Sequence, residues 1–239
     1  GTKKNYFIAG LILSIAVMIK VTPVLLLVFY LAKKKYYMLF GAIAGIIIIF
    51  FLTLAAGGYH HWTEFFAFLP NLGHGVDIPG MNPADIIANF SLAGYLSRIF
   101  GTGEMLVRII SLFLLAGVFI WLYFDTKKFE FRYSHLLLIP FLTAMVITSP
   151  LAYLHHEIYI APGAIIILLH AMRNISERKI KIFSSVFIIL LIFLSIDYPI
   201  YYERFTNNEI ITDYLFSFNL FALIALFFLS KYYAKKYQE

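Results

Sequence analysis

Two adjacent histidines and a carboxylate close a polar stretch late in the chain. His155, His156 and Glu157 end residues 148–157 and stand directly before an apolar run. A helix that begins here would favour an anion such as phosphate at its N-terminus. A histidine at that end would donate a hydrogen bond to a phosphate or a sugar hydroxyl, or move a proton. Adjacent histidines point about 100° apart on a helix, unlike the i, i+4 pair of zinc proteases, so we expect no metal. The alternative interpretation is a polar cap at a membrane edge.

A second group of polar residues has the spacing of one helix face. Ser91, Tyr95 and Arg98 are separated by four and then three residues, which places them on the same side of a helix. The Asn-Pro pair at 82–83 is typical of a helix start, and the apolar pattern that follows ends at Gly101. We therefore expect one amphipathic helix lying in the membrane interface. Its polar face would present a cation and two hydroxyls to a headgroup, unless the helix serves only as an anchor.

A lysine and a proline interrupt the first apolar segment. Lys20 and Pro23 lie near its middle, where a charge in hydrocarbon and a missing helix hydrogen bond are both costly. We expect two short helices that enter from one side and meet near Lys20. This arrangement keeps Lys3, Lys4 and Lys33–Lys35 together on that side. Lys20 would then pair with the phosphate of a lipid headgroup; equally open is a lysine whose stem lies in apolar surroundings while its head reaches water.

Apolar segments that recur along the chain must position these residues. Apolar side chains make up 62% of the sequence and charged ones 13%, against roughly half and a quarter in soluble domains. The 239 residues suffice for about six or seven spans of about 20 residues each. We predict an all-α, polytopic membrane protein in which residues 1–239 form a single transmembrane domain. Its seven apolar segments are 6–31, 38–56, 105–124, 135–149, 158–172, 182–198 and 214–230.

Basic residues between the segments predict the orientation. The loops that follow the first, third, fifth and seventh segments hold 13 of the 19 basic residues, and the loops between them hold only Arg98 and Arg204. Basic loops are normally cytoplasmic, so we expect the C-terminus in the cytoplasm of a multi-pass plasma-membrane protein. The outer face then carries most of the polar side chains: Glu64, Asp77, Asp85, Glu104, Glu157, Glu203, Glu209, Asp213, His60, His61, His74, His155 and His156. Any chemistry should therefore face outward.

The outer loop 57–104 is expected to carry interfacial helices. Trp62, Phe65, Phe66 and Phe68 are typical of an aromatic membrane-surface segment, and the Gly/Pro-rich residues 71–80 are typical of turns. The net charge of +6 does not indicate a nucleic-acid partner, because the basic residues flank apolar spans and form no single stripe. The absence of cysteine excludes disulfides and thiolate metal sites.

Taken in order, the three polar patterns resemble the polyprenol-phosphate-sugar-dependent glycosyltransferases of family 87, in the C-type superfamily. That family, which includes mannosyltransferases, shows Lys-x-x-Pro before a basic cluster, then Asn-Gln-Ser-Leu before Arg, then Ser-Pro-x-Ser-Trp-x-His-His. The matching residues here are Lys20, Pro23, Asn89, Ser91, Leu92, Arg98, Ser149, Pro150, His155 and His156. The chain departs from the pattern at Phe90, Ala152 and Tyr153, which replace glutamine, serine and tryptophan. The resemblance covers roughly residues 8–165.

The resemblance implies a reaction at the outer face. A polyprenyl-phosphate-linked sugar donor would enter from the lipid bilayer, and a hydroxyl of a glycolipid or glycan acceptor would attack the anomeric carbon with inversion. The family's general base is an aspartate in its first outer loop. No residue here matches it by motif, and the role is not carried over to Asp77 or Asp85. We expect Gly1 to be internal to a longer protein whose first spans precede it, so that this chain is a C-terminal portion.

Three functional interpretations follow from the sequence. The preferred one is a membrane glycosyltransferase (EC 2.4 class) with no cofactor, moving a hexose such as mannose. His155 and His156 are its expected catalytic residues, and the expected donor-phosphate ligands are Lys20, Arg98, Ser91 and Glu157. The alternatives are a noncatalytic membrane subunit or degenerate paralogue, and a transporter or flippase of lipid-linked sugars. A transporter would typically show repeated halves, which the sequence lacks.

Overall fold

The computed structural model describes residues 3–68, 89–101, 103, 105–130, 135–152, 154–173, 178–195 and 217–237, and all regular elements in these ranges are helical. This confirms the predicted all-α membrane fold. Three described helices are long and apolar enough to cross a membrane: α3 (Tyr36–Gly57), α6 (Met105–Lys128) and α12 (Phe218–Lys236). The chain divides into two compact units, residues 1–72 with 119–128, and residues 73–118 with 129–239. Each unit is described by itself.

The remaining apolar segments are shorter helices. The first predicted segment consists of α1 (Lys3–Ile19), the 3₁₀ helix η1 (Thr22–Leu25) and α2 (Leu26–Ala32). The fourth, fifth and sixth correspond to α7 (Leu138–Ile147), α8 (Ala161–Arg173) and α9 (Arg178–Leu194). The predicted end of the last segment at residue 230 is wrong, because α12 continues to Lys236. Lysines near a helix C-terminus complement its dipole, so charge does not end the helix there.

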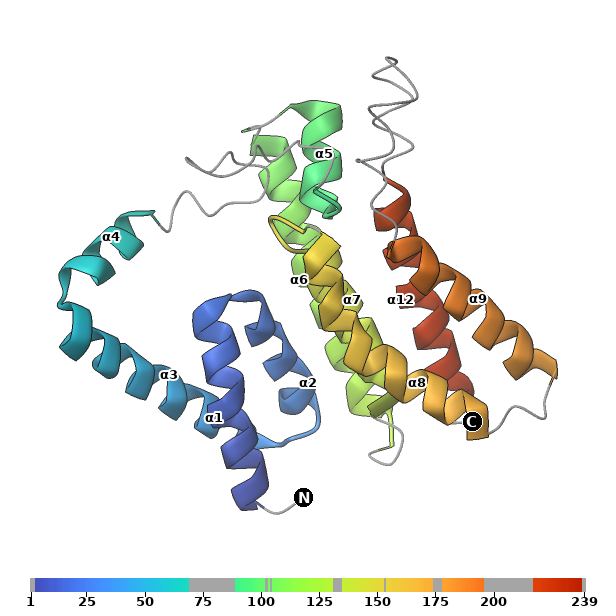
Figure 1. The fold of residues 1–239 in the computed structure, drawn as a ribbon, viewed down its shortest axis with the longest axis horizontal. Helices are drawn as coiled ribbons and strands as arrows, with labels where there is room; N and C mark the ends of the chain where they lie inside the picture. The colour runs from blue at the N-terminus through green and yellow to red at the C-terminus, as the bar shows by residue number, and fades with distance from the viewer. Residues whose placement is uncertain are drawn as a thin grey trace. The chain divides into compact units, whose positions relative to one another are not determined.

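In the first unit the chain forms a helical hairpin before α3 (Figure 1). The amide of Lys20 still donates to Ala16 (2.9 Å), and Pro23 then falls in the first turn of η1, where its missing N–H is tolerated. The Nζ atom of Lys3 lies 5.3 Å from the Tyr37 ring centroid, and that of Lys35 lies 5.0 Å from the Tyr6 ring centroid. Both lysine clusters therefore share one end of the unit, and Lys20 lies at the other turn. The predicted break in the first segment is confirmed.

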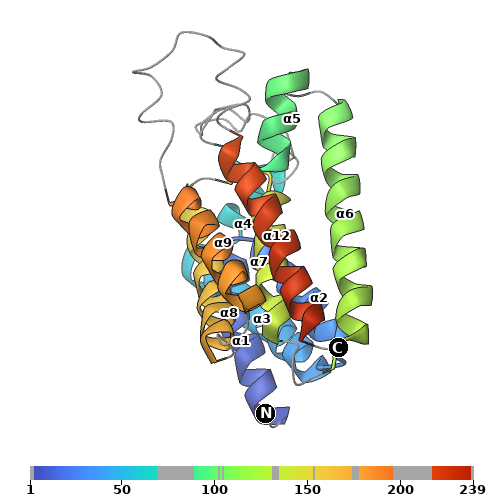
Figure 2. The same cartoon turned by 90° about the vertical axis from the view of Figure 1, so that its right-hand side faces the viewer.

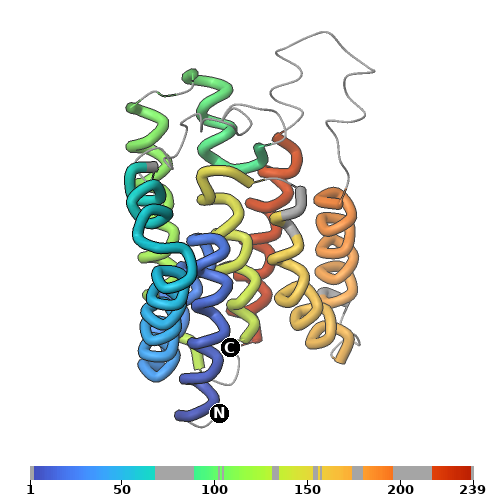
Figure 3. Tube along the Cα trace, turned by 60° about the vertical axis from the view of Figure 1, so that its left-hand side comes forward, coloured from blue at the N-terminus to red at the C-terminus, as the bar shows by residue number. Residues whose placement is uncertain are grey.

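Small residues hold α1 against α3 (Figure 3). Gly10 and Ser14 of α1 face Gly41 and Gly45 of α3, and all four are buried. A Cβ at Gly41 would overlap the backbone oxygen of Phe7, and one at Gly45 would overlap the Ser14 hydroxyl. Because small residues let two backbones approach closely, van der Waals contact can hold the pair even where lipid removes any hydrophobic driving force.

In the second unit, successive helices run in alternate directions around α7 (Figure 2). Every residue from Ile139 to Val146 of α7 is buried, and α7 and α9 both pack against α12. His170 Nδ1 lies 2.9 Å from the Tyr233 hydroxyl, so the C-terminal ends of α8 and α12 meet. Helix α7 spans only about 15 Å along its axis, and it forms the core of this unit.

Two short helices lie between α3 and α6 in the chain. Helix α4 (His60–Phe68) confirms the expected aromatic helix, and Trp62 fixes it to the end of α3. The Trp62 indole donates to Thr53 Oγ1 (3.2 Å), and its ring lies 4.5 Å from that of Phe50. Helix α5 (Leu92–Phe100) is the other one. The predicted turns at 71–80 and the helix start at Asn82 lie outside the described residues.

The α1–α3 contact predicts that one added methyl group separates the two helices. Gly41→Ala should lower the free energy of unfolding by roughly 1–3 kcal/mol, as overpacking does. The matched control is Gly117→Ala in α6, where a Cβ would meet no atom within 4 Å. That control should be neutral, or more stable by up to about 1 kcal/mol from helix propensity. Thermal unfolding of the purified protein in detergent measures both, and equal effects would contradict the packing argument.

Candidate functional site

The second and third polar patterns of the sequence are bonded to each other in the second unit. The amide of Phe90 donates to the Ala152 carbonyl (2.7 Å), and the Ser91 hydroxyl donates to the Pro150 carbonyl (3.3 Å). These bonds thus join residues 89–91, called the strapped segment below, to residues 150–152, called the strapped turn. The two stretches lie about 60 positions apart in the chain and neither is helical. Because both segments lack regular helix bonds, these contacts satisfy polar groups that would otherwise be buried without partners.

The side chain of Asn89 completes this pair. Its Oδ1 accepts from the amides of Ala152 (2.9 Å) and Ser91 (3.2 Å), and its Nδ2 lies 3.5 Å from the Pro150 carbonyl oxygen. Asn89 is fully buried, so each of these bonds replaces water. The family pattern marked Asn89, but its role in holding the two segments was not predicted. The available signal was an asparagine just before an apolar run, where such side chains bond to nearby backbone.

Ser91 does not lie on the polar helix face that its spacing predicted. It is the N-cap of α5, with extended backbone, and its hydroxyl accepts from the Gly94 amide (3.0 Å). The expected continuous helix into α5 is therefore wrong at 89–91, because these residues leave helical geometry to bond with Pro150 and Ala152. The buried Ser91 hydroxyl therefore caps α5 through the Gly94 amide and binds the Pro150 carbonyl.

Arg98 ties the same region to the start of α12. Its Nη1 donates to the Asn89 carbonyl (3.1 Å), and its Nη2 lies 3.4 Å from Ser217 Oγ. The half-buried guanidinium thus bridges α5, the strapped segment and α12. A fork of five N–H donors suits this use, and the same fork suits phosphate. Ser217 is a site neighbour that sequence reasoning missed, since no spacing relates it to Arg98.

His155 and His156 lie three and four residues after Ala152, the last residue of the strapped turn. Residues Leu154–Ile160 form the 3₁₀ helix η4, and α8 begins only at Ala161. The histidines therefore precede the α-helix N-terminus by about one and a half turns, rather than forming it as predicted. His156 is 9% exposed, and its ring stacks on Tyr159 at 6.1 Å with planes 14° apart. The side chains of His155 and Glu157 lie outside the described residues.

The structure brings together part of the predicted site. Ser91 and Arg98 meet around Asn89, and His156 follows the turn that Asn89 holds. Lys20 belongs to the first unit, where it occupies the tip of the hairpin. Within the described ranges, no group of three or more metal-ligating side chains could hold an ion. Asp77 and Asp85, the two acidic residues of 69–88, fall outside these ranges.

A family model, that of glycosyltransferase family 87, matches residues 1–150. The chain belongs to glycosyltransferase family 87. It is accordingly a membrane glycosyltransferase by family. The matched range contains Lys20, the strapped segment, Arg98 and Pro150, and it ends before the histidine pair. No curated protein and no solved structure matches the chain.

In this family 87 chain, Phe90 stands where the family pattern has a glutamine, and its burial accounts for the apolar side chain. Phe90 is 2% exposed, and its contribution to the strap is its backbone amide. An apolar ring suits this buried position, and the bond to Ala152 comes from the backbone, which a change of side chain does not remove.

The capping role of Ser91 is testable by comparing two buried serines: Ser91, the N-cap, and Ser97, inside α5. Ser91→Ala removes the acceptor of the Gly94 amide and the donor to Pro150, so it should cost about 1 kcal/mol, and at most about 2. The control is Ser97→Ala, a buried serine whose hydroxyl donates to the Ala93 carbonyl one turn back (2.8 Å). That bond adds little to a helix. Hydrogen exchange of the α5 amides should be faster only in the Ser91 variant. Equal protection in both variants would contradict the cap.

Proposed function

We propose that this family 87 chain moves a sugar, a hexose such as mannose, from a polyprenyl-phosphate donor to a glycolipid or glycan acceptor at the outer face of the plasma membrane. The observation that supports this most is the strapped segment: Asn89 and Arg98 fix the turn at Pro150 that leads directly to His156. Such irregular backbone is tolerated at membrane depth only where protein covers it or a cavity borders it. A site for a lipid-linked substrate needs that kind of border.

The proposed reaction is an inverting displacement. The acceptor hydroxyl oxygen forms a bond to the anomeric carbon, and the bond from that carbon to the phosphate oxygen breaks with its electron pair. The hydroxyl proton passes to a carboxylate general base, which this chain does not assign. Negative charge develops on the departing phosphate, and donors placed there stabilise the transition state most.

Each predicted residue receives a role in this proposal. His155 and His156 would donate to the departing phosphate, and Arg98 would contact the donor phosphate while holding the strapped turn. Lys20, at the hairpin tip of the first unit, would contact a donor phosphate, and Glu157 would contact the sugar-phosphate at η4. Ser91 acts indirectly, by capping the helix that carries Arg98.

The histidine role predicts a loss of transfer without a loss of folding. His156→Ala in the full protein should reduce sugar transfer at least about 100-fold, the lower range for a proton-transferring group. His155→Ala should act likewise. Transfer from a radiolabelled polyprenyl-phosphate sugar to membrane acceptors measures the rate, and the amount of protein in the membrane fraction checks insertion. The control is His61→Ala, whose side chain on α4 is largely exposed and which should transfer normally.

The outcomes separate the functional interpretations. Normal transfer in both the His155 and His156 variants would remove these residues from the site. No transfer by the unaltered full protein, together with normal movement of the lipid-linked sugar across the bilayer, would favour the flippase interpretation. Neither activity would favour a noncatalytic subunit.

The proposed orientation has its own test. Fusion of a fluorescent protein after Lys236 should give fluorescent cells, because this end is expected in the cytoplasm. Alkaline phosphatase fused at the same position should be inactive, whereas phosphatase inserted after Asn207, in the predicted outer loop, should be active. The reverse pattern would invert the proposal and place the strapped segment in the cytoplasm.

A further inference from the structure

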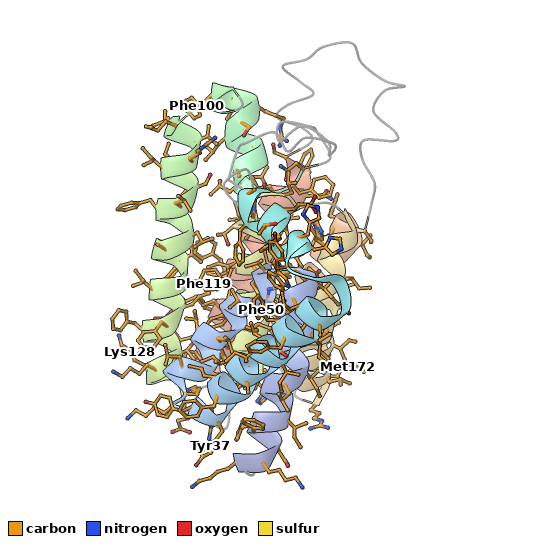
Figure 4. All side chains as sticks on the ribbon, turned by 90° about the vertical axis from the view of Figure 1, so that its left-hand side faces the viewer. Tyr37, Phe50, Phe100, Phe119, Lys128 and Met172 are labelled. Carbon is orange, nitrogen blue, oxygen red and sulfur yellow. The ribbon has the colours of Figure 1, made fainter. Side chains whose placement is uncertain are left out.

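The lysine-rich end of the first unit carries a charge that nothing in the transfer reaction uses. Residues 1–63 hold six lysines and no acidic residue. Five of these lysines, at positions 3, 4 and 33–35, gather where α1 begins and α2 ends. Two ring contacts link the two groups of lysines, Lys3 over Tyr37 and Lys35 over Tyr6. Lys128 ends α6 toward the same end of this unit as Tyr37, while Phe50 lies further along α3 (Figure 4).

The backbone at Lys34 has a conformation that residues other than glycine rarely adopt. Lys34 has φ 54°, which no other non-glycine residue within the described ranges matches in sign. The turn is a Schellman motif: the Lys35 amide donates to the Tyr30 carbonyl (2.9 Å), and the Lys34 amide donates to the Leu31 carbonyl (3.0 Å). Glycine is the usual residue at this position, since it adopts the left-handed region without steric cost. A strained residue points to a use for its side chain, and the side chain here is an exposed cation.

An apolar stripe starts beside this cluster and runs along α3. Tyr36, Phe40, Ile43, Ile47 and Phe51 are all exposed, and their spacing places them on one face of the helix. Tyrosines at the start of such a stripe are typical of the level of lipid headgroups. Together, the basic cluster and the stripe complement a lipid, whose anionic headgroup would lie at the lysines and whose hydrocarbon would lie along the helix.

We propose that the cluster of Lys3, Lys4 and Lys33–Lys35 binds the phosphate headgroup of an anionic phospholipid, whose acyl chains lie along the exposed face of α3. Juxtamembrane groups of four to eight basic residues commonly bind anionic lipids. Burial lowers the pKa of Lys33 below its usual value, and a phosphate close by would favour its charged form. A soluble anion would use the lysines but not the stripe, so the stripe favours a membrane lipid.

The test is Lys34→Gly, which removes one charge while suiting the left-handed turn. The full protein is purified in a neutral detergent and titrated with phosphatidylglycerol or phosphatidylcholine, and native mass spectrometry counts the retained lipids. The unaltered protein should retain phosphatidylglycerol in preference to phosphatidylcholine. Lys34→Gly should bind phosphatidylglycerol about fivefold more weakly, the effect of roughly one lysine near an anionic surface. Its thermal unfolding temperature should be equal or higher.

A second lysine controls for net charge. Lys236→Gln makes the same change in charge at the end of α12, in the other unit, and should leave phosphatidylglycerol retention unchanged. The proposal is overturned if the unaltered protein retains both lipids equally, or if the two variants lose phosphatidylglycerol equally. It is also overturned if inorganic phosphate at the same concentration displaces the lipid, since a soluble anion would then be the ligand.

Discussion

The hydrogen bonds between Asn89 and the turn at Pro150–Ala152 hold two non-helical segments of the second unit together. In an apolar medium each backbone amide and carbonyl needs a partner inside the protein, because lipid provides none. Helices meet this need by themselves, whereas residues 89–91 and 150–152 do not lie in helices. One buried asparagine supplies both an acceptor and a donor to this pair, and Arg98 adds a further donor. The chain can therefore leave helical geometry twice at one place, just before α5 and just before η4.

The need to pair each backbone amide and carbonyl inside the protein also explains how much of the fold is predictable from the sequence. Spans, their alternating direction and the break at Lys20 follow from local properties: apolar length, basic loops, and a proline that lacks an amide hydrogen. Each of these acts within a few residues, so each is readable from the sequence. The predicted end of the last segment at residue 230 is wrong for the converse reason. The lysines beyond it can extend their charged side chains to water while the backbone stays helical.

The candidate site was less predictable, because its contacts join distant positions. Helical spacing grouped Ser91 with Tyr95 and Arg98, yet Ser91 caps the helix since its backbone is bound to a segment about 60 residues later. No residue near position 91 in the sequence indicates that its partner is Pro150. Likewise Ser217 meets Arg98 across 119 positions. What the sequence could supply was the order of the polar blocks, and the family 87 model matches residues 1–150. The resemblance thus predicts which residues belong to the candidate site, while only the structure shows which of them hold the backbone.

The turns of the first unit differ in the residue that each one uses. After α3 the chain turns at Gly58, which has φ 73° and open space around it, so conformation alone decides the residue. After α2 the equivalent left-handed position holds Lys34. After α1 the break holds Lys20, whose neighbour Pro23 already sets the geometry. Lysine is costly in or beside hydrocarbon, and glycine adopts the left-handed region at position 34 without steric cost. Lys34 at this turn is therefore in keeping with the proposed lipid phosphate, and Lys20 at the opposite end of the hairpin with its proposed role toward a donor phosphate.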